Sequence, residues 1–394
     1  MSGPRLFLVA GEPSGDRLGA ALMAALRGER PGVRFLGVGG ALMREQGLDP
    51  LFPISDIAVM GLVEVLPRLR GILRRIDQTA RAAIAARPDA LVTIDSPDFT
   101  LRVAARVRAA LPGLKVVHYV APSVWAWRPG RARRMARHVD HVLALLPFEP
   151  PYMTAAGMGC DFVGHPAAEL PAPDPALMAQ TRPDGGPLLA VLPGSRRGEV
   201  RRLLPLFRAT VAELAARLPG LAVVLPAAGL VAAEVAAAVA DWPVPVRLLD
   251  PRGLPPAVAE ARKFAAFAAA DAALAASGTV VLELAAMGCP MVAAYRVNHL
   301  SSLIARHLLR VDSANLVNLL CGRHAVPEFL QEHARPQAMA AALRPLLTDA
   351  RARAAQRTAL DEAMRRVGRG GVPPSQRAAH ALLGAIGRGG ETVP

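Results

Sequence analysis

The chain has few aromatic residues and no closely spaced pair of cysteines. Aromatic residues make up only 4% of its 394 residues, so Ala, Leu and Val must fill most of the core. The three cysteines, Cys160, Cys289 and Cys321, lie far apart, which excludes a CxxC metal or redox motif and a disulfide framework. We therefore expect buried thiols in a reducing compartment.

The sequence also lacks an apolar run long enough to cross a bilayer, and its first residues lack the pattern of a signal peptide. The strongest apolar run, 221–240, is interrupted by Pro226, Gly229 and Glu234, and it favours a strand followed by a helix. We therefore expect a cytoplasmic protein whose contact with a membrane is peripheral.

Lysine is nearly absent as well, and arginine supplies the positive charge. The chain carries 46 basic and 32 acidic residues, a net charge of +14, and Lys115 and Lys263 are its two lysines. A coding bias toward Arg and Ala explains this composition, but a basic face also suits nucleic acid, anionic lipid or a phosphorylated substrate. A nucleic-acid-binding protein would need stacking aromatics along a basic groove, and the low aromatic content argues against it.

Short apolar runs alternate with amphipathic or Ala-rich helical runs along the chain. This alternation predicts an α/β protein with parallel sheets that are covered by helices on both faces. The predicted strands are 5–10, 33–38, 89–94, 115–120, 139–145, 187–192, 220–225, 244–249, 271–275 and 290–295.

The alternation stops at 164–186, where the density of proline indicates an inter-domain linker. We predict two Rossmann-like, doubly wound domains, 1–168 and 187–340, that face each other across a cleft. A helical tail, 341–394, would pack back on these domains. In such sheets ligands bind beyond the carboxyl ends of the strands, so the loops after the strands are the candidate sites.

The first strand is followed by the loop GEPSGD, residues 11–16. Glycines allow the backbone to approach a ligand closely, but Glu12 and Asp16 would repel a phosphate. Together with Ser14, these acids favour contact with sugar hydroxyls. A tight turn with no ligand is the alternative interpretation.

The strand at 89–94 is followed by Asp95 and Asp98, which places two carboxylates where a catalytic base would lie. Asp98 would otherwise be the N-cap of the next helix. The spacing also resembles a metal-binding pair, but no third ligand is recognisable, and we predict neither a metal nor a cofactor.

Two of the three tryptophans, Trp125 and Trp127, fall in a Pro-rich loop ahead of an Arg-rich helix. A single tryptophan usually belongs to the core. A pair in such a loop, in a chain with few aromatic residues, is more typical of a binding site.

The strand at 187–192 is followed by a loop in which Gly194 and Ser195 can present backbone N–H groups, beside the guanidinium of Arg196. This arrangement predicts a diphosphate cradle. The loop is not a P-loop, because the GK[ST] ending is missing.

The strand at 271–275 is followed by Ser277, Gly278 and Thr279, which begin a helix whose N-terminus would attract phosphate oxygens. Glu283 lies one helical turn further on the same face, where a carboxylate can accept two hydrogen bonds from a ribose diol. Together with the loop at 194–196, this pattern predicts a nucleotide-sugar site.

Taken together, the motifs cover nearly the whole chain. They are GEPSGD (11–16), GVGG (37–40), MGLVEVLP (60–67), IDSPDF (94–99), APSVWAWRPGR (121–131), FVGHP (162–166), LPGSR (192–196), ASGTVVLE (276–283), CPMVAAYRV (289–297) and NLLCGRHAVPEFLQ (318–331). This set resembles the lipid A disaccharide synthases, a family of inverting glycosyltransferases with the GT-B fold. The order of Arg197 and Gly198 and the residue Ala121 depart from the family pattern, and neither departure affects the proposed chemistry.

The resemblance implies a reaction between UDP-2,3-diacylglucosamine and 2,3-diacylglucosamine 1-phosphate, in which the 6-hydroxyl of the acceptor attacks the anomeric carbon and UDP leaves. Asp98 would be the base, and Arg196 with the helix that starts at Ser277 would stabilise the departing UDP. Asn318 would line the donor site, and Glu283 would hold the ribose. We expect the acceptor or the donor sugar to contact Glu12, Ser14, Asp16, Ser123 and Trp125.

Both substrates are lipids, so we also expect contact with the anionic cytoplasmic face of the inner membrane. The segment 60–76 has the pattern of an interfacial helix, with apolar residues flanked by arginines. An ordinary amphipathic surface helix is the alternative. The predicted membrane-facing residues are Met60, Leu62, Val63, Leu66, Arg68, Leu69, Arg70, Ile72, Leu73, Arg74 and Arg75. The sequence is also compatible with a homodimer.

The nearest alternative function is another GT-B enzyme that uses UDP-N-acetylglucosamine, such as a lipid II-type transferase or a UDP-sugar epimerase. It would share the nucleotide loops, but the tryptophan loop and IDSPDF argue against it. A catalytically inactive sensor of sugar nucleotides is disfavoured by the presence of Asp98 and Arg196.

Overall fold

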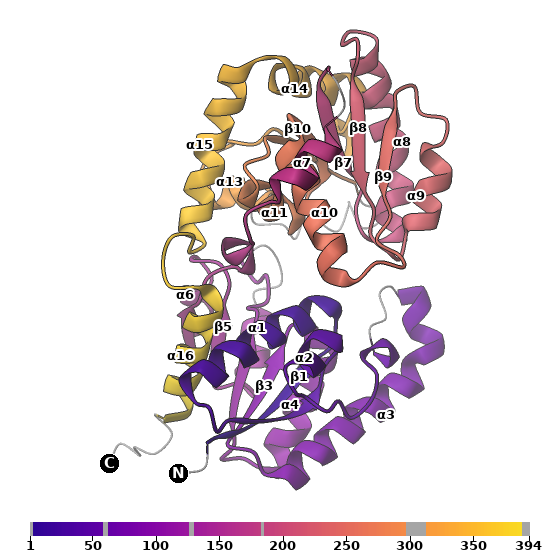
Figure 1. Cartoon of the computed structure of the whole chain (residues 1–394). Coiled ribbons are helices and arrows are strands. Elements are labelled where there is room, and N and C mark those ends of the chain that lie inside the picture. The colour runs from indigo at the N-terminus through magenta and orange to yellow at the C-terminus, as the bar shows by residue number, and fades with distance from the viewer. Residues whose placement is uncertain (1–2, 58–61, 126–129, 183–184, 297–312, 388–394) are drawn as a thin grey trace. The chain divides into compact units, whose positions relative to one another are not determined.

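A computed structural model describes residues 3–57, 62–125, 130–182, 185–296 and 313–387, with the side chains of 62–68 outside this description. The chain forms two compact units (Figure 1). The first unit combines Met1–Glu169 with Val367–Pro394, and the second unit is Leu170–Arg366. The C-terminal segment thus returns to the unit in which the chain begins.

In the first unit, the described strands form one parallel sheet in the order β2-β1-β3-β4-β5-β6. Successive side chains of a strand point to opposite faces. In β1, Leu6 and Leu8 therefore enter one core, and Phe7 and Val9 enter the other. The strands are β1 (Arg5–Ala10), β2 (Arg34–Val38), β3 (Ala90–Ile94), β4 (Lys115–Tyr119), β5 (His141–Ala144) and β6 (Gly159–Phe162).

Helices cover both faces of this sheet. The C-terminal helix α16 (Pro374–Gly387) packs beside α1 (Pro13–Glu29), and Ala378 and Leu382 of α16 join the core that contains Leu6 (Figure 1). On the other face, α3 (Leu62–Ala86) packs against α4 (Pro97–Ala110). The shorter helices of this unit are α2 (Ala41–Glu45), α5 (Gly130–Met135) and α6 (Pro150–Thr154), with 3-10 turns η1 (Ile54–Asp56) and η2 (Pro166–Glu169).

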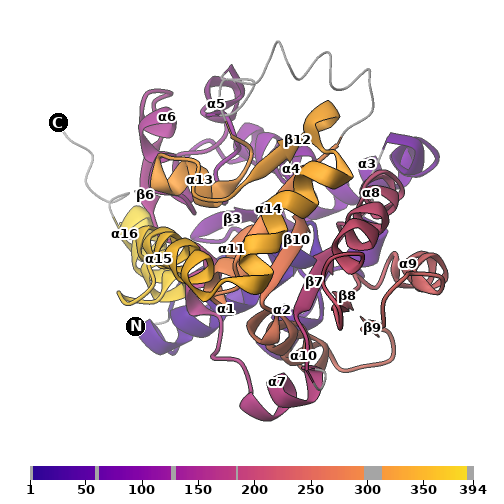
Figure 2. The same ribbon diagram turned by 90° about the horizontal axis from the view of Figure 1, so that it is seen from above.

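The second unit holds a parallel sheet whose described strands run in the order β12-β11-β10-β7-β8-β9. They are β7 (Leu188–Leu192), β8 (Ala222–Pro226), β9 (Val246–Leu249), β10 (Ala272–Ala276), β11 (Met291–Tyr295) and β12 (Glu328–Leu330). The core on one face joins Leu189 and Val191 of β7 to Phe207 of α8 (Arg197–Ala215). In Figure 2, α14 (Pro336–Thr348) lies over β10, and it packs against α8 and the central strands.

The other helices of the second unit are α7 (Pro175–Thr181), α9 (Ala232–Val239), α10 (Pro256–Ala269), α11 (Val280–Ala286), α13 (Leu316–Cys321) and α15 (Ala350–Arg366), with the 3-10 turn η3 (Gln331–His333). Of the region 341–394, α15 belongs to this unit, whereas α16 belongs to the first.

The prediction of an α/β protein with parallel sheets is confirmed, and each predicted strand lies where a described strand is found. Strands β6 and β12 were not predicted, because they are four and three residues long and carry Gly, Asp or Glu in place of an apolar run. The thiols of Cys289 and Cys321 are buried as expected, and Cys160 is half-buried.

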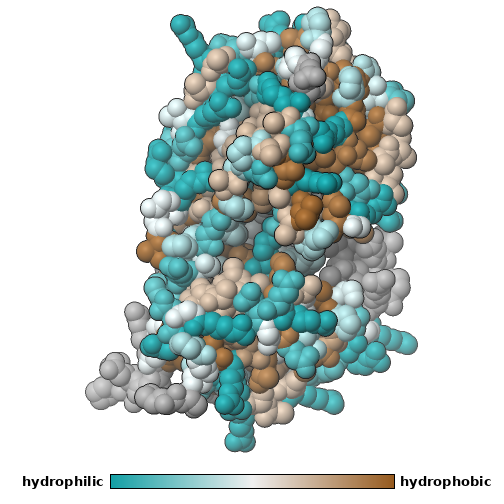
Figure 3. All heavy atoms as spheres, viewed as in Figure 1, coloured by the Kyte–Doolittle hydropathy of each residue, from teal (hydrophilic) through white to brown (hydrophobic). Residues whose placement is uncertain are grey.

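Hydrophilic and hydrophobic residues are interspersed over the face of the molecule shown in Figure 3. Among the described helices, none combines the length and the apolar character that crossing a bilayer requires. The run at 221–240 forms β8 and α9, as its interrupted pattern predicts.

Candidate functional sites

At the carboxyl edge of the first sheet, the loops after β1 and β3 pack tightly together. A Cβ atom on Gly11 would lie 2.5 Å from the Cβ of Ser96, so the approach of these loops requires glycine. Ser96 Oγ donates to Glu12 Oε1 at 2.9 Å, and Ser14 Oγ donates to Asp95 Oδ2 at 3.0 Å. The structure therefore brings Glu12 and Ser14 together with the end of β3, in one polar cluster.

Backbone strain is concentrated at the same edge. Asp95 and Ser96 have φ angles of 51° and 45°, and Val120, directly after β4, has a φ angle of 86°. Such values are uncommon for residues other than glycine and are a marked outlier for a β-branched residue. Strain of this kind persists only where surrounding contacts hold it, and it clusters at functional sites.

Asp98 lies in the first turn of α4, where its side chain is 96% exposed. Its Oδ1 atom lies 3.4 Å from Nη2 of Arg131 on α5. The residue that precedes the helix is Ser96, so Asp98 is not the N-cap that the sequence left as an alternative. An exposed carboxylate beside a guanidinium can accept a proton from a bound alcohol.

Asp16, which we expect from the sequence to contact a sugar, is held by backbone groups in this structure. Its side chain is almost buried, with the residue 6% exposed, and it accepts backbone N–H groups from Gly40, Leu42 and Met43 at 2.7–3.1 Å. These N–H groups belong to the N-cap and the first turn of α2, and such groups lack partners within the helix. Asp16 therefore fixes the GVGG loop to α1, and a sugar hydroxyl would have to compete with these three contacts.

The described part of the tryptophan loop, residues 120–125, contacts the loop that follows β5. Ser123 is exposed, whereas Trp125 is half-buried and packs edge-on against Phe148, with the ring centroids 5.1 Å apart. Trp125 Nε1 donates to Glu149 Oε1 at 3.3 Å. Trp127 lies outside the described residues.

Glu149 is a residue that the sequence analysis missed. It is only 4% exposed, and the N–H groups of Leu145 and Leu146 both donate to Oε2 at 3.0 Å. Burial raises the pKa of this carboxyl to about 7, although the three hydrogen bonds favour the ionised form. The signal in the sequence is an acidic residue between Phe148 and Pro150, directly after a buried strand.

His118 lies beneath the same edge, in β4. It is buried, and its Nδ1 atom lies 2.8 Å from Thr93 Oγ1 of β3. Burial and the charge of Arg131 lower the pKa of His118 to about 4. The imidazole is therefore neutral at physiological pH and is part of the interior.

In the second unit, the loop after β7 brings the side chain of Glu199 close to Gly194 and Arg196. Gly194 has a φ angle of 112°, and a Cβ atom there would lie 2.6 Å from Glu199 Oε2. Arg196 is the N-cap of α8, and its Nη1 atom donates to Glu199 Oε1 at 3.2 Å. Tyr295, at the end of β11, has a raised pKa. Burial is the main cause, the charge of Glu199 adds to the increase, and the charge of Arg196 opposes it. Glu199 was not predicted.

Ser277, Gly278 and Thr279 follow β10 and precede α11, as predicted. The helix spans only seven residues, so its dipole is small, and individual N–H groups are the relevant donors. Ser277 Oγ donates to Ala314 O and to Glu328 Oε1, both at 3.2 Å. Glu328 Oε2 accepts from Ser313 Oγ at 2.6 Å and thereby ties this turn to the start of α13.

Glu283 lies on α11, and its Oε2 atom accepts from Lys263 Nζ of α10 at 3.0 Å. Both side chains are about one-quarter exposed, so a ligand can reach the pair. Lys263 was not singled out by the sequence analysis. Its signal is its rarity, because it is one of two lysines in 394 residues.

Asn318 of α13 is buried, with 3% of the residue exposed. Its Oδ1 atom accepts from the N–H of Val326 at 2.8 Å, and its Nδ2 atom donates to Val326 O at 2.9 Å. These contacts close the loop that leads to β12. In this structure the amide of Asn318 serves the fold of the 318–326 segment.

The predicted membrane-facing segment is divided by the structure. Met60 lies outside the described residues, and so do the side chains of Leu62, Val63, Leu66 and Arg68. Ile72 and Leu73 pack against the core, whereas Arg75 lies over the ring of Phe52 and pairs with Asp56. Only Leu69, Arg70 and Arg74 of the predicted set are both described and exposed.

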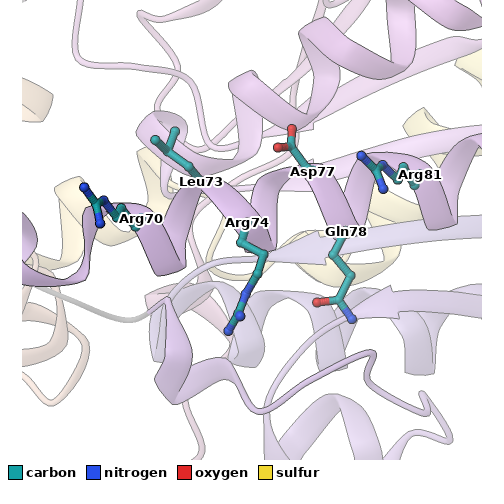
Figure 4. A pocket seen from close by; sticks show the side chains of 6 residues that line it. All are labelled: Arg70, Leu73, Arg74, Asp77, Gln78 and Arg81. Carbon is teal, nitrogen blue, oxygen red and sulfur yellow. The ribbon is translucent and has the colours of Figure 1, made fainter.

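A pocket on the outer face of α3 contains two of these arginines. Residues four and seven positions apart lie on one face of a helix, and Arg70, Arg74 and Arg81 share such a face of α3. Figure 4 shows that their guanidinium groups point in different directions from this face. Leu73, Asp77 and Gln78 complete the lining of the pocket.

Comparison with known proteins identifies relatives over nearly the entire length. Residues 6–371 match the model of a family described as lipid-A-disaccharide synthetase. The lipid-A-disaccharide synthase of Ruegeria pomeroyi is 55% identical over 383 residues, which cover 96% of this chain and 94% of the relative. The corresponding protein of Rhodospirillum centenum is 51% identical over 386 residues, which cover 97% and 94%.

Solved structures with the same fold are more distant in sequence. A UDP-GlcNAc 2-epimerase from Neisseria meningitidis bound to UDP-GlcNAc has a TM-score of 0.62 at 12% identity, over 98% of this chain and 100% of that one. The calicheamicin glycosyltransferase CalG4 has a TM-score of 0.54 at 18% identity, with both chains covered completely. At these identities the similarity concerns the fold alone.

Proposed function

Because the chain belongs to the lipid-A-disaccharide synthetase family and is a UDP-sugar-dependent glycosyltransferase of lipid A biosynthesis, we propose how its two units divide the reaction. The donor is UDP-2,3-diacylglucosamine and the acceptor is 2,3-diacylglucosamine 1-phosphate. The first unit supplies the base and contacts to the acceptor, and the second unit binds UDP. The match to residues 6–371 carries the activity, and the loops that follow the strands of each unit support its division between them.

In the first unit, Asp98 takes the proton from the 6-hydroxyl of the acceptor. Its exposure supports this role, because a bound alcohol can reach the carboxylate directly. Arg131 keeps the carboxylate in place and supplies positive charge beside it. Glu12, Ser14, Ser123 and Trp125 provide polar and aromatic contacts for the sugar, whereas Asp16 supports the loops from beneath.

In the second unit, the diphosphate lies against the backbone of 194–196 and the guanidinium of Arg196. The leaving oxygen gains negative charge, which Arg196 and the N–H groups of 277–279 offset. Glu199 contacts Arg196 in the free protein, and binding of the diphosphate replaces that contact.

Glu283 accepts hydrogen bonds from the ribose hydroxyls. Lys263 holds one oxygen of this carboxylate at 3.0 Å and so sets its orientation. Asn318 contributes indirectly, by fixing the 318–326 segment beside the turn that Glu328 ties to Ser277.

The lipid chains of both substrates require contact with a membrane. We assign this contact to the exposed face of α3 that carries Arg70, Arg74 and Arg81. Each arginine near an anionic surface contributes about 1 kcal/mol of attraction. Arg75 is left out of this set because it is committed to Asp56.

The proposed activity is tested by following UDP release from UDP-2,3-diacylglucosamine with and without 2,3-diacylglucosamine 1-phosphate. We expect release that depends on the acceptor, together with formation of a disaccharide 1-phosphate. A parallel reaction with UDP-N-acetylglucosamine tests the alternative of an epimerase. Conversion of that nucleotide sugar to its 2-epimer, with no disaccharide from the lipid substrates, would overturn the proposal.

A further inference from the structure

A buried carboxylate ties the tryptophan loop to the neighbouring strand. Trp125 follows β4 by six residues, and Glu149 follows β5 by five. One oxygen of Glu149 accepts from the indole N–H, and the other accepts two backbone N–H groups from its own loop. The side chain therefore links two loops at the carboxyl edge of the sheet.

All three partners of Glu149 are donors, so the arrangement is matched to a carboxylate. A buried charge is costly unless it is hydrogen-bonded, and these contacts offset part of that cost. A glutamine would present an amide N–H₂ to at least one of the same donors. The identity of the residue is therefore set by the contacts, and an isosteric replacement does not satisfy them.

The loop that Glu149 holds begins under strain. Val120 has a φ angle of 86°, and its N–H donates to Leu143 O of β5 at 3.0 Å. After the loop, α5 places Arg131 3.4 Å from Asp98. Trp125 thus lies in the connection between β4 and α5, and α5 carries Arg131, the partner of the proposed base Asp98.

We propose that Glu149 is a positioning residue for the acceptor, which fixes the Trp125 indole as a surface for the sugar ring of the bound acceptor. Phe148 packs roughly perpendicular to the indole, with the ring centroids 5.1 Å apart, and Trp125 keeps part of its surface exposed for the ligand. The proposal rests on the assignment of the first unit to the acceptor. In this proposal, the indole of Trp125 gives the loop its specificity for the acceptor. Glu149, in the loop that follows β5, sets the orientation of that indole.

The kinetic test compares Glu149→Gln, Trp125→Phe and the double variant. We expect each single variant to raise KM for the acceptor about tenfold, the equivalent of one hydrogen bond to a charged group. KM for the donor and the affinity for UDP should remain unchanged. The double variant should be no worse than either single variant, because both changes remove the same contact.

Trp242→Phe is the matched control. Trp242 lies in the second unit, and its indole N–H is buried without a hydrogen-bond partner in the described structure. Loss of that N–H should leave KM for the acceptor unchanged. Additive effects of Glu149→Gln and Trp125→Phe, or equal effects on donor and acceptor, would overturn the proposal.

A spectroscopic measurement tests the link independently of turnover. In a Trp127→Phe, Trp242→Phe background, Trp125 is the sole tryptophan. Adding Glu149→Gln should increase quenching of its fluorescence by acrylamide at least twofold, because the indole is no longer held. Unchanged quenching would contradict the role of Glu149, whereas an absence of transferase activity in the wild type would contradict the proposed function and leave this measurement valid.

Discussion

Lys263 Nζ lies 3.0 Å from Glu283 Oε2 and joins α10 to α11 beside the turn at Ser277. Both side chains are partly exposed, so the pair is held in a solvated setting where such contacts are worth about 1 kcal/mol or less. Its importance lies in orientation, because a carboxylate that is fixed at one oxygen presents the other in a defined direction.

Lys263→Met should weaken UDP binding about fivefold, since Glu283 loses the group that orients it. Isothermal calorimetry with UDP measures this change. Lys115→Met, at the other lysine and in the first unit, is the control and should bind UDP like the wild type. Equal affinities of the two variants would refute the orienting role of Lys263.

Arg196→Ala should lower the affinity for UDP more strongly, by tenfold or more, because it removes a charge-assisted contact to the diphosphate. Arg201→Ala removes an arginine of the same helix that pairs with Glu234, and it should have little effect. Calorimetry again gives the comparison. An Arg196 variant that binds UDP as tightly as the Arg201 variant would exclude the cradle.

Asp98→Asn should reduce turnover by about a hundredfold or more, the usual contribution of a general base, with UDP affinity retained. Asp241→Asn, which changes an exposed aspartate paired with Arg208, should retain wild-type turnover. The rate of UDP release at saturating substrates is the readout. Near wild-type turnover in the Asp98 variant would remove this residue from the base role.

The stability of the protein should decrease as the pH falls from 6.5 toward 4, and His165 is one cause. Its Nδ1 atom accepts the N–H of Ala167 at 3.1 Å, and burial lowers its pKa from 6.5 to about 4. Within this window the unfolded chain binds a proton that the folded chain does not, so stability is lost as pH falls. The loss from this group is about 2 kcal/mol at pH 5.

His165→Asn should therefore show a smaller loss of stability between pH 7 and pH 5 than the wild type, measured by urea unfolding at each pH. The exposed His333 provides the control, and His333→Asn should keep the wild-type dependence. The explanation fails if His165→Asn and the wild type lose the same free energy of unfolding over this range.

Replacing Arg70, Arg74 and Arg81 by Ser should weaken association with liposomes that contain anionic lipid by about a hundredfold, given about 1 kcal/mol for each charge. A variant with Arg217, Arg262 and Arg344 replaced loses the same charge from exposed positions in the second unit. Co-sedimentation distinguishes them. If both variants lose binding equally, net charge alone would explain the association.

The sheets were predictable from the sequence because their central strands are continuous apolar runs, such as Leu6–Ala10 and Leu188–Leu192. The loops at 11–16, 194–196 and 277–279 were predictable because they follow such strands at the edge where ligands bind. The sequence does not predict that α16 packs on the first unit. An amphipathic pattern shows that one face of a helix is buried, but it does not indicate which element covers that face.

Side-chain pairing limited the prediction of the sites. Asp16 and Asp98 both follow strands and look alike in the sequence, yet one accepts three backbone N–H groups and the other is exposed. Glu149 and Lys263 act through partners 24 and 20 residues away, at separations that only the fold determines. The residue types therefore indicated where polar side chains gather after the strands. Only the structure shows which of these side chains hold the backbone and which are accessible to a ligand.

A crystal structure of the protein with bound UDP tests the central claim most directly. The account predicts the diphosphate against the backbone of 194–196 and the guanidinium of Arg196, with the ribose hydroxyls on the carboxylate of Glu283. UDP bound at any other place in the second unit, or in the first unit, would contradict it.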